Sequence, residues 1–142
     1  MRWTDISVRT SVSPETKAEI GKAATLIVIG SPGYNVVSRA VEEDFDVEVT
    51  FARDNAVLVH RDTGPLDKTG GLGLVQRVTN HTTGQTAFYL AGPSTPGTIA
   101  AATYLLREWR QLAKRHRARP FHEIVRASSV DGDQYVVAPN NW

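Results

Sequence analysis

Apolar residues along the chain follow two different periods, and the change of period marks the predicted elements. Thr25 to Ile29 (TLIVI) is a continuous apolar run with β-branched residues, which is typical of a strand covered on both faces. From Pro96 to Arg117 the apolar residues recur at helical spacing, which predicts the one long helix of the chain. Thr95 is its predicted N-cap, and Pro96 suits the first helical position, where an amide hydrogen would be unpaired anyway. A further apolar, β-prone run, Thr86 to Ala91, predicts the strand before this helix.

Shorter patterns predict the remaining elements. Ser13-Pro14-Glu15 is typical of a helix start, here of a helix to about Lys22, and Asn35 is the predicted N-cap of a helix through about Glu43. The stretch Thr63 to Gly71 has no apolar period, which favours a mobile loop. Alternating segments around turn residues predict antiparallel strands at 46–53 with 56–60 and at 121–127 with 134–138, and a further strand is predicted at 72–78.

Two strand–loop–helix units therefore stand among a set of hairpins. The simplest packing is a Rossmann-like, three-layer α/β fold: a mixed, partly parallel sheet with helices on both faces and a C-terminal hairpin. The chain has 142 residues, which predicts a single domain over 1–142. Residues 1–12 form either an N-terminal arm or a lead-in strand in this prediction.

Composition narrows the function classes. The net charge of +1 gives no reason to expect a nucleic-acid partner, and the absence of cysteine excludes a disulfide framework, a thiolate metal site and a cysteine nucleophile. The same absence favours a cytoplasmic location. No apolar run is long enough to span a bilayer and the N-terminal ten residues lack a signal-peptide core, so we expect no membrane association.

The loops GSPGYN (30–35) and GPSTPG (92–97) are built alike, since each follows a buried strand and precedes an amphipathic helix. If the two strands are parallel neighbours, both loops meet at the carboxyl edge of the sheet, where α/β proteins bind ligands. Helix starts present unpaired amides and a partial positive charge, which favour anions. The predicted ligand-binding residues are Gly30, Ser31, Gly33, Asn35, Arg39, Arg77, Gly92, Ser94, Thr95, Gly97 and Thr98.

Two alternatives stay open for this prediction. Each loop taken alone is explained equally well as a tight strand-to-helix connection. Arg39 and Arg77 are candidates for bidentate pairing with a phosphate, and also ordinary surface residues. Neither loop fits the dinucleotide motif GxGxxG or the phosphate-binding motif GxxxxGK[ST], so we expect no nucleotide cofactor and no other cofactor.

Three segments together resemble a poorly characterised prokaryotic Rossmann-like domain: GSPGYNVVSR, GLGLVQRVTN and AGPSTPGTIAAATYL. The resemblance implies a Rossmann-like fold found as a module beside sensor or DNA-binding parts. The fragment FYLAGP also resembles the opening of nucleoside deoxyribosyltransferases, in which an acidic nucleophile lies on a later helix. Here the following helix carries one acidic residue, Glu108, about three turns in. The positions that match the first pattern are Gly30, Ser31, Pro32, Asn35, Ser38, Arg39, Gly73, Val75, Arg77, Asn80, Ala91, Gly92, Gly97, Thr98, Ala100 and Ala101.

Other chemistry-bearing residues form no recognised motif. The four histidines (His60, His81, His116 and His122) show no paired ligand spacing, so we expect no metal site. No GxSxG motif is present, and the acidic cluster Glu42, Glu43, Asp44 and Asp46 is typical of a solvated helix end. The basic run near the end of the long helix is explained by the helix dipole, with a nucleic-acid contact as the alternative; its members are Arg107, Arg110, Lys114, Arg115, Arg117 and Arg119.

The leading hypothesis is a domain that binds and senses a small anionic, nucleotide-like ligand. It rests on two amide-rich helix starts without an evident catalytic acid, base or nucleophile. The first alternative is an enzyme that cleaves a nucleoside or nucleotide glycosidic bond with a carboxylate such as Glu43. The second is an interaction module in which the basic helix, or the ends with Trp3 and Trp142, contact a protein partner or another copy of the chain.

Overall fold

The computed structural model describes residues 21, 25–52, 57–66 and 71–137. Within these residues the protein is a mixed α/β structure with two sheets and two helices. The predicted N-terminal arm (1–12), Trp3 and Trp142 lie outside the described residues, as does the predicted helix 13–22 apart from Gly21.

The main sheet has five strands in the order β1-β6-β5-β7-β8. β1 and β6 run parallel, and the other neighbouring pairs are antiparallel. The predicted mixed, partly parallel sheet and the C-terminal hairpin of β7 and β8 are thus confirmed. The strands are β1 (Thr25–Ile29), β5 (Leu72–Thr79), β6 (Thr86–Ala91), β7 (Phe121–Ala127) and β8 (Tyr135–Val137).

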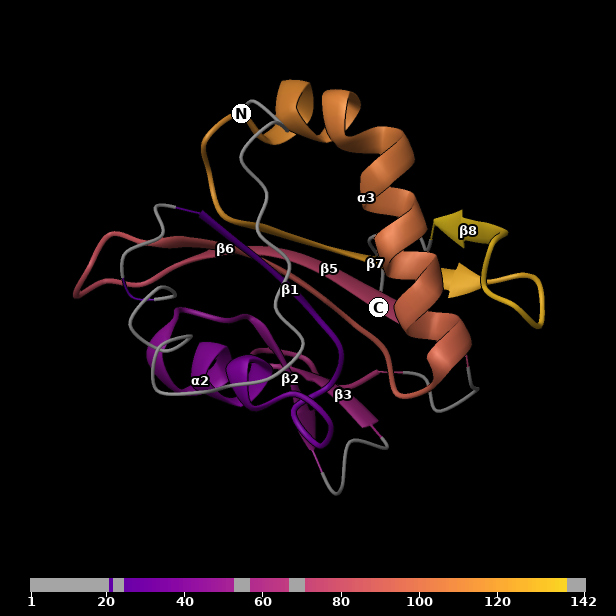
Figure 1. Ribbon diagram of the computed structural model, residues 1–142, viewed down its shortest axis with the longest axis horizontal. Helices are drawn as coiled ribbons and strands as arrows, with labels where there is room; N and C mark the ends of the chain where they lie inside the picture. Colours follow the sequence, from indigo (N-terminus) through magenta and orange to yellow (C-terminus); the bar gives the residue numbers. More distant parts are fainter. Residues whose placement is uncertain (1–20, 22–24, 53–56, 67–70, 138–142) are drawn as a thin grey trace.

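The long helix α3 (Thr95–His116) packs along one face of the main sheet (Figure 1). Its residues Ala101 and Leu105 share a core with Val75 of β5, Leu90 of β6 and Val125 of β7. Side chains alternate between the two faces of a strand, so residues next to these in the sequence point to the other side of the sheet. One face of β5, β6 and β7 is therefore covered by α3.

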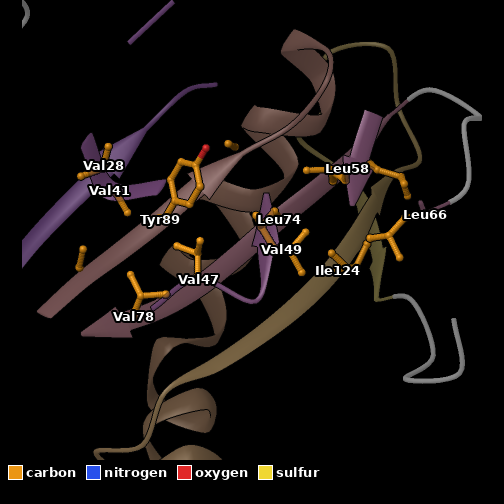
Figure 2. Close-up of a cluster of buried hydrophobic side chains, with 13 residues drawn as sticks. Val28, Val41, Val47, Val49, Leu58, Leu66, Leu74, Val78, Tyr89 and Ile124 are labelled. Atoms are coloured by element: carbon orange, nitrogen blue, oxygen red, sulfur yellow. The ribbon is translucent and has the colours of Figure 1, made fainter. Parts of the chain in front are cut away.

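The opposite face carries a second, three-stranded antiparallel sheet of β2 (Val49–Ala52), β3 (Val57–His60) and β4 (Gly64–Pro65). Figure 2 shows Val49 and Leu58 of this small sheet in one buried cluster with Leu74 of β5 and Ile124 of β7. The shorter helix α2 (Val36–Asp44) adds Val41 to the same cluster. The predicted hairpin at 46–60 is confirmed, and it forms a separate sheet over the first one that the sequence did not predict.

Part of the predicted mobile loop, Thr63 to Gly71, is ordered structure, and the prediction is wrong for that part. Gly64 and Pro65 form β4, which pairs with β3, and the next side chain, Leu66, is buried in the core. The amide of Leu66 donates to the carbonyl oxygen of Leu58 at 2.9 Å. Residues 67–70 lie outside the described part of the chain. A two-residue strand contains too little sequence for a hydrophobic period, and so the pattern did not reveal it.

Candidate functional site

The two glycine loops leave the same edge of the main sheet side by side. β1 and β6 are paired in parallel from Thr25 opposite Thr86 to Ile29 opposite Leu90. Beyond the strand, the amide of Gly30 donates to the carbonyl oxygen of Leu90 at 2.8 Å. The condition on which the predicted site depended, that the two strands are parallel neighbours, is therefore confirmed.

The first loop is held by its own side chains. Asn35 is the N-cap of α2, as predicted, and its Oδ1 accepts from the amide of Val37 at 2.9 Å. The hydroxyl of Ser38 donates to the carbonyl oxygen of Gly30 at 2.6 Å. Ser31 is buried, and its carbonyl oxygen accepts from the amide of Asn35 at 3.0 Å. These contacts fix the backbone and satisfy one of the amides at the start of α2.

The second loop ends one residue earlier than the sequence predicted. Ser94, in place of Thr95, is the N-cap of α3, and its Oγ accepts from the amide of Gly97 at 3.3 Å. The hydroxyl of Thr98 turns back to donate to the carbonyl oxygen of Ser94 at 3.2 Å. Thr95 is instead an exposed first residue of the helix. Both residues are N-cap formers, and only the path of the chain after Gly92 decides between them.

The glycines of the second loop have a packing role. A Cβ atom at Gly97 would lie 2.0 Å from the carbonyl oxygen of Leu72, and one at Gly92 would lie 2.5 Å from the same oxygen. On β5, a Cβ atom at Gly73 would lie 2.3 Å from the carbonyl oxygen of Gly97. The start of α3 therefore approaches β5 backbone to backbone. This close approach explains all three glycines without a ligand.

The electrostatics at this edge favour negative charge. Neither α2 nor α3 has an acidic residue in its first turn, where acids usually offset the positive end of the helix dipole. Arg39 is exposed and lies against the first loop, because its Nη2 donates to the carbonyl oxygen of Pro32 at 3.3 Å. The two loop segments contain no Asp or Glu. A cation and two uncompensated helix starts thus share one edge of the sheet.

Arg77 does not lie with the loops. Its Nη1 donates to the carbonyl oxygens of Arg117 at 3.5 Å and Arg119 at 3.3 Å, and its guanidinium lies over the ring of Phe88. These carbonyls follow the last turn of α3, at the opposite end from Gly97. The side chain thus neutralises the negative end of the helix dipole. Of the eleven predicted site residues, Arg77 is the one that the fold places at the other end of α3.

Among the acidic residues at the end of α2, Glu42 faces inward. Its Oε1 accepts from the hydroxyl of Tyr89 at 2.9 Å and from the amide of Phe51 at 3.2 Å. Burial raises the pKa of the Glu42 carboxyl above its ordinary value, although both hydrogen bonds act in the other direction. Glu43, the carboxylate that the enzymatic alternative singled out, is exposed. Helical periodicity alone does not predict which of these two carboxylates is buried, because burial depends on how α2 packs on the sheet.

The basic run at the end of α3 is not a uniform solvated face. Arg115 donates to Oε1 of Glu123 at 2.7 Å, and His116 lies at the same distance from that oxygen. Glu123 is only 7% exposed and also accepts from the hydroxyl of Tyr104. Burial opposes ionisation of Glu123, but the hydrogen bonds from Tyr104, His116 and Arg115 outweigh it and lower its pKa. Arg115 and His116 lie on α3, eight and seven residues before Glu123 on β7. Helical periodicity along α3 therefore did not predict this internal ion pair.

Glu48, His60 and His122 form a cluster that the sequence analysis missed. Each can offer one nitrogen or carboxylate oxygen, and these three atoms lie within 4.8 Å of one another. The expectation of no metal site considered only spacing along the chain, and these residues come from three separate segments. The pairing of Val49 with His60 in the small sheet would have revealed two of the three.

No protein-family model, no curated protein and no solved structure matches this chain. Among the described residues, no helix is both long enough and apolar enough to cross a membrane.

Proposed function

We propose that the protein binds a small anionic, nucleotide-like ligand at the edge of the main sheet where the two glycine loops lie, and that it senses this ligand. The observation that carries the proposal is the parallel, in-register pairing of β1 with β6. It brings the starts of α2 and α3 to one edge of one sheet. The proposal treats the two strand–loop–helix units as Rossmann-like in this local sense. It also includes a cytoplasmic location for the protein.

The first turn of an α-helix contains up to four amides without partners inside the helix. The caps Asn35 and Ser94 satisfy one amide each, and Pro96 contributes none. The remaining amides, together with the guanidinium of Arg39, are the groups that we expect to bind a phosphate. The hydroxyls of Ser94 and Thr95 would contribute further donors at the same edge.

Thermal unfolding against a panel of nucleotides, sugar phosphates and inorganic phosphate tests this proposal. A ligand at ten times its Kd should stabilise the protein by about 1.4 kcal/mol, which corresponds to a Tm increase of a few degrees for a chain of this size. Arg39→Gln should weaken binding without lowering the Tm of the free protein, since the side chain is exposed. Arg110→Gln, on the exposed part of α3, is the matched control. The proposal fails if no member of the panel raises the Tm at millimolar concentration.

A second candidate function is hydrolysis of a nucleoside or nucleotide glycosidic bond, and the raised pKa of Glu42 favours it. A carboxyl whose pKa is raised by burial is the kind of group that can protonate a leaving base. Incubation with NAD and with nucleosides, followed by chromatography, should release the free base. Glu42→Gln should abolish the release and Glu43→Gln should leave it intact. An unchanged substrate pool with the unmodified protein removes this candidate.

A further inference from the structure

Three potential metal ligands converge on the face of the main sheet that is covered by the small sheet. Glu48 directly precedes β2, His60 ends β3, and His122 is the second residue of β7. Their ligand atoms lie within 4.8 Å of one another. In a tetrahedral zinc site with bonds of about 2.0–2.1 Å, neighbouring ligand atoms lie about 3.3 Å apart. Small rotations of partly exposed side chains are therefore sufficient to close the cluster around an ion.

The fold holds two of the three ligands in place through the backbone. Val49 of β2 is paired with His60 of β3, which sets Glu48 beside His60. The buried side chain of Gln76 on β5 accepts from the amides of Glu48 and Val49, both at 2.9 Å, and so fixes this end of β2 over the main sheet. His122 lies opposite the same Gln76 in the pairing of β5 with β7. The three positions are thus determined by long-range strand pairing and by one buried amide side chain.

The local charges and the accessibility suit a divalent ion. The side chains of Glu48 and His122 are 42% and 29% exposed, so that an ion can reach them from solvent. Arg61 interacts electrostatically with Glu48, but its Nη1 is bound to Oδ1 of Asp46 at 2.9 Å, which offsets its charge. The rings of His60 and His122 lie 4.9 Å apart between centroids and are tilted by 58°. Two imidazoles and one carboxylate form a donor set that is typical of zinc and similar transition metals, whereas Mg²⁺ and Ca²⁺ prefer oxygen ligands.

We propose that Glu48, His60 and His122 form a three-ligand site for a divalent transition-metal ion of the zinc class, with at least one coordination position open to solvent. The chain contains no cysteine, so a fourth thiolate is excluded. With three protein ligands, the remaining position of a tetrahedral ion is taken by water or by a bound molecule.

Metal binding must displace hydrogen bonds that are present without the ion. Nδ1 of His122 is hydrogen-bonded to Oε2 of Glu48, and this contact has to open if both of these atoms become ligands. Nδ1 of His60 accepts from the amides of Asp62 at 3.1 Å and Thr63 at 3.3 Å. Ligation through Nδ1 replaces these contacts, and ligation through Nε2 places a proton on Nδ1, which faces the two amides unfavourably. The turn at Asp62 and Thr63 is therefore expected to move in either case.

The experiment uses the full chain without an affinity tag, freed of metal with a chelator. Titration calorimetry with Zn²⁺ should give a stoichiometry of one. NMR should show the amide resonances of Asp62 and Thr63 shifting in step with the binding isotherm. Mg²⁺ at the same concentrations should leave these resonances in place.

His122→Asn and Glu48→Gln should each weaken Zn²⁺ binding at least about tenfold. His81→Asn is the matched control, because His81 forms an exposed histidine–carboxylate pair with Asp46 at 3.5 Å, and no third potential ligand joins this pair among the residues that the structure describes. If a variant unfolds, the NMR titration of the unmodified protein still decides the question. The proposal is overturned if Zn²⁺ does not bind at a stoichiometry of one, if Asp62 and Thr63 do not respond, or if His81→Asn weakens binding as much as His122→Asn.

Discussion

Glu123 is a carboxylate that the fold keeps charged, although its side chain is almost fully buried. It accepts a hydrogen bond from the hydroxyl of Tyr104, and its Oε1 lies 2.7 Å from both Nη1 of Arg115 and Nε2 of His116. These contacts join α3 to β7. Burial also raises the pKa of the Tyr104 hydroxyl well above its usual value. The raised pKa therefore keeps the tyrosine a hydrogen-bond donor at a pH where an ordinary tyrosine would ionise.

Replacing Glu123 with Gln should lower the free energy of unfolding at neutral pH by about 2 kcal/mol, the size of hydrogen bonds to a charged group. The pKa of Glu123 in the folded protein lies below its ordinary value of 4.5. Its contribution to stability is therefore present above pH 4.5 and is lost as the pH falls through the lowered value. Urea unfolding across this window should show a smaller acid loss for Glu123→Gln than for the unmodified chain.

Glu43→Gln is the control for that comparison, since it removes the same charge from an exposed position of α2. It should change the free energy of unfolding by less than about 0.5 kcal/mol. Equal acid sensitivity of the unmodified chain and Glu123→Gln would contradict the assignment of a lowered pKa.

Gly97 shows how a single residue sets the distance between two elements. Because a Cβ atom there would lie 2.0 Å from the carbonyl oxygen of Leu72, Gly97→Ala should destabilise the protein by about 2 kcal/mol or more. Gly21→Ala is the control, because no atom of the described part of the chain lies within 4 Å of the added Cβ atom. Chemical denaturation of both variants measures the difference. Equal stability of Gly97→Ala and the unmodified chain would mean that α3 approaches β5 less closely.

At the scale of elements, the small sheet is attached to the main sheet through polar as well as apolar contacts. Gln76 is 1% exposed on β5, and its Oε1 accepts from two amides at the start of β2. Its Nε2 donates to the carbonyl oxygen of Val49 at 3.0 Å. β2 is an edge strand of the small sheet. The side chain of Gln76 therefore provides hydrogen bonds to the edge of β2 that does not face β3. Gln76 lies on the same face of β5 as the buried apolar residues Leu74 and Val78.

Gln76→Leu keeps the volume but leaves two amides and a carbonyl without partners, which should lower the free energy of unfolding by about 3 kcal/mol. Hydrogen exchange at the amide of Val49 should accelerate more than exchange in α3. Gln111→Leu on the exposed side of α3 is the control, with a change below about 0.5 kcal/mol. Unchanged exchange at Val49 would show that the small sheet does not depend on Gln76.

At the scale of the whole molecule, β5 joins the two cores. Its residues alternate between the cluster under the small sheet, which includes Leu74 and Val78, and the cluster under α3, which includes Val75. Unfolding of either cluster therefore exposes one face of the same strand. This shared strand favours a single cooperative unit, as the predicted single domain requires.

Unfolding should accordingly follow one transition. In a chain with Trp3 and Trp142 replaced by Phe, fluorescence of Trp109 reports on the α3 core, and far-UV circular dichroism reports on all elements. The two urea midpoints should coincide. Separate midpoints would divide the protein into independently stable parts.

The sequence alone predicted the described strands other than β4, and both described helices. The signals for these features are local: the apolar run TLIVI, the cap Asn35, the helical period after Pro96 and the turns between alternating strands. The likeness of the two strand–loop–helix units also made the shared edge a conditional prediction, which the parallel pairing of β1 with β6 fulfilled.

Only the tertiary structure decided which distant residues meet. The small sheet folds over the main sheet, and this packing brings Glu48 to His122 across 74 positions of the sequence. Strand pairing within the main sheet places Arg77 at the far end of α3. Glu42 contacts Tyr89 and Phe51, while Glu43 remains exposed. A local sequence pattern predicts which face of its own helix or strand a side chain occupies. How that helix or strand packs against its neighbours depends on the free energy of the whole core, and a short stretch of sequence does not determine this packing.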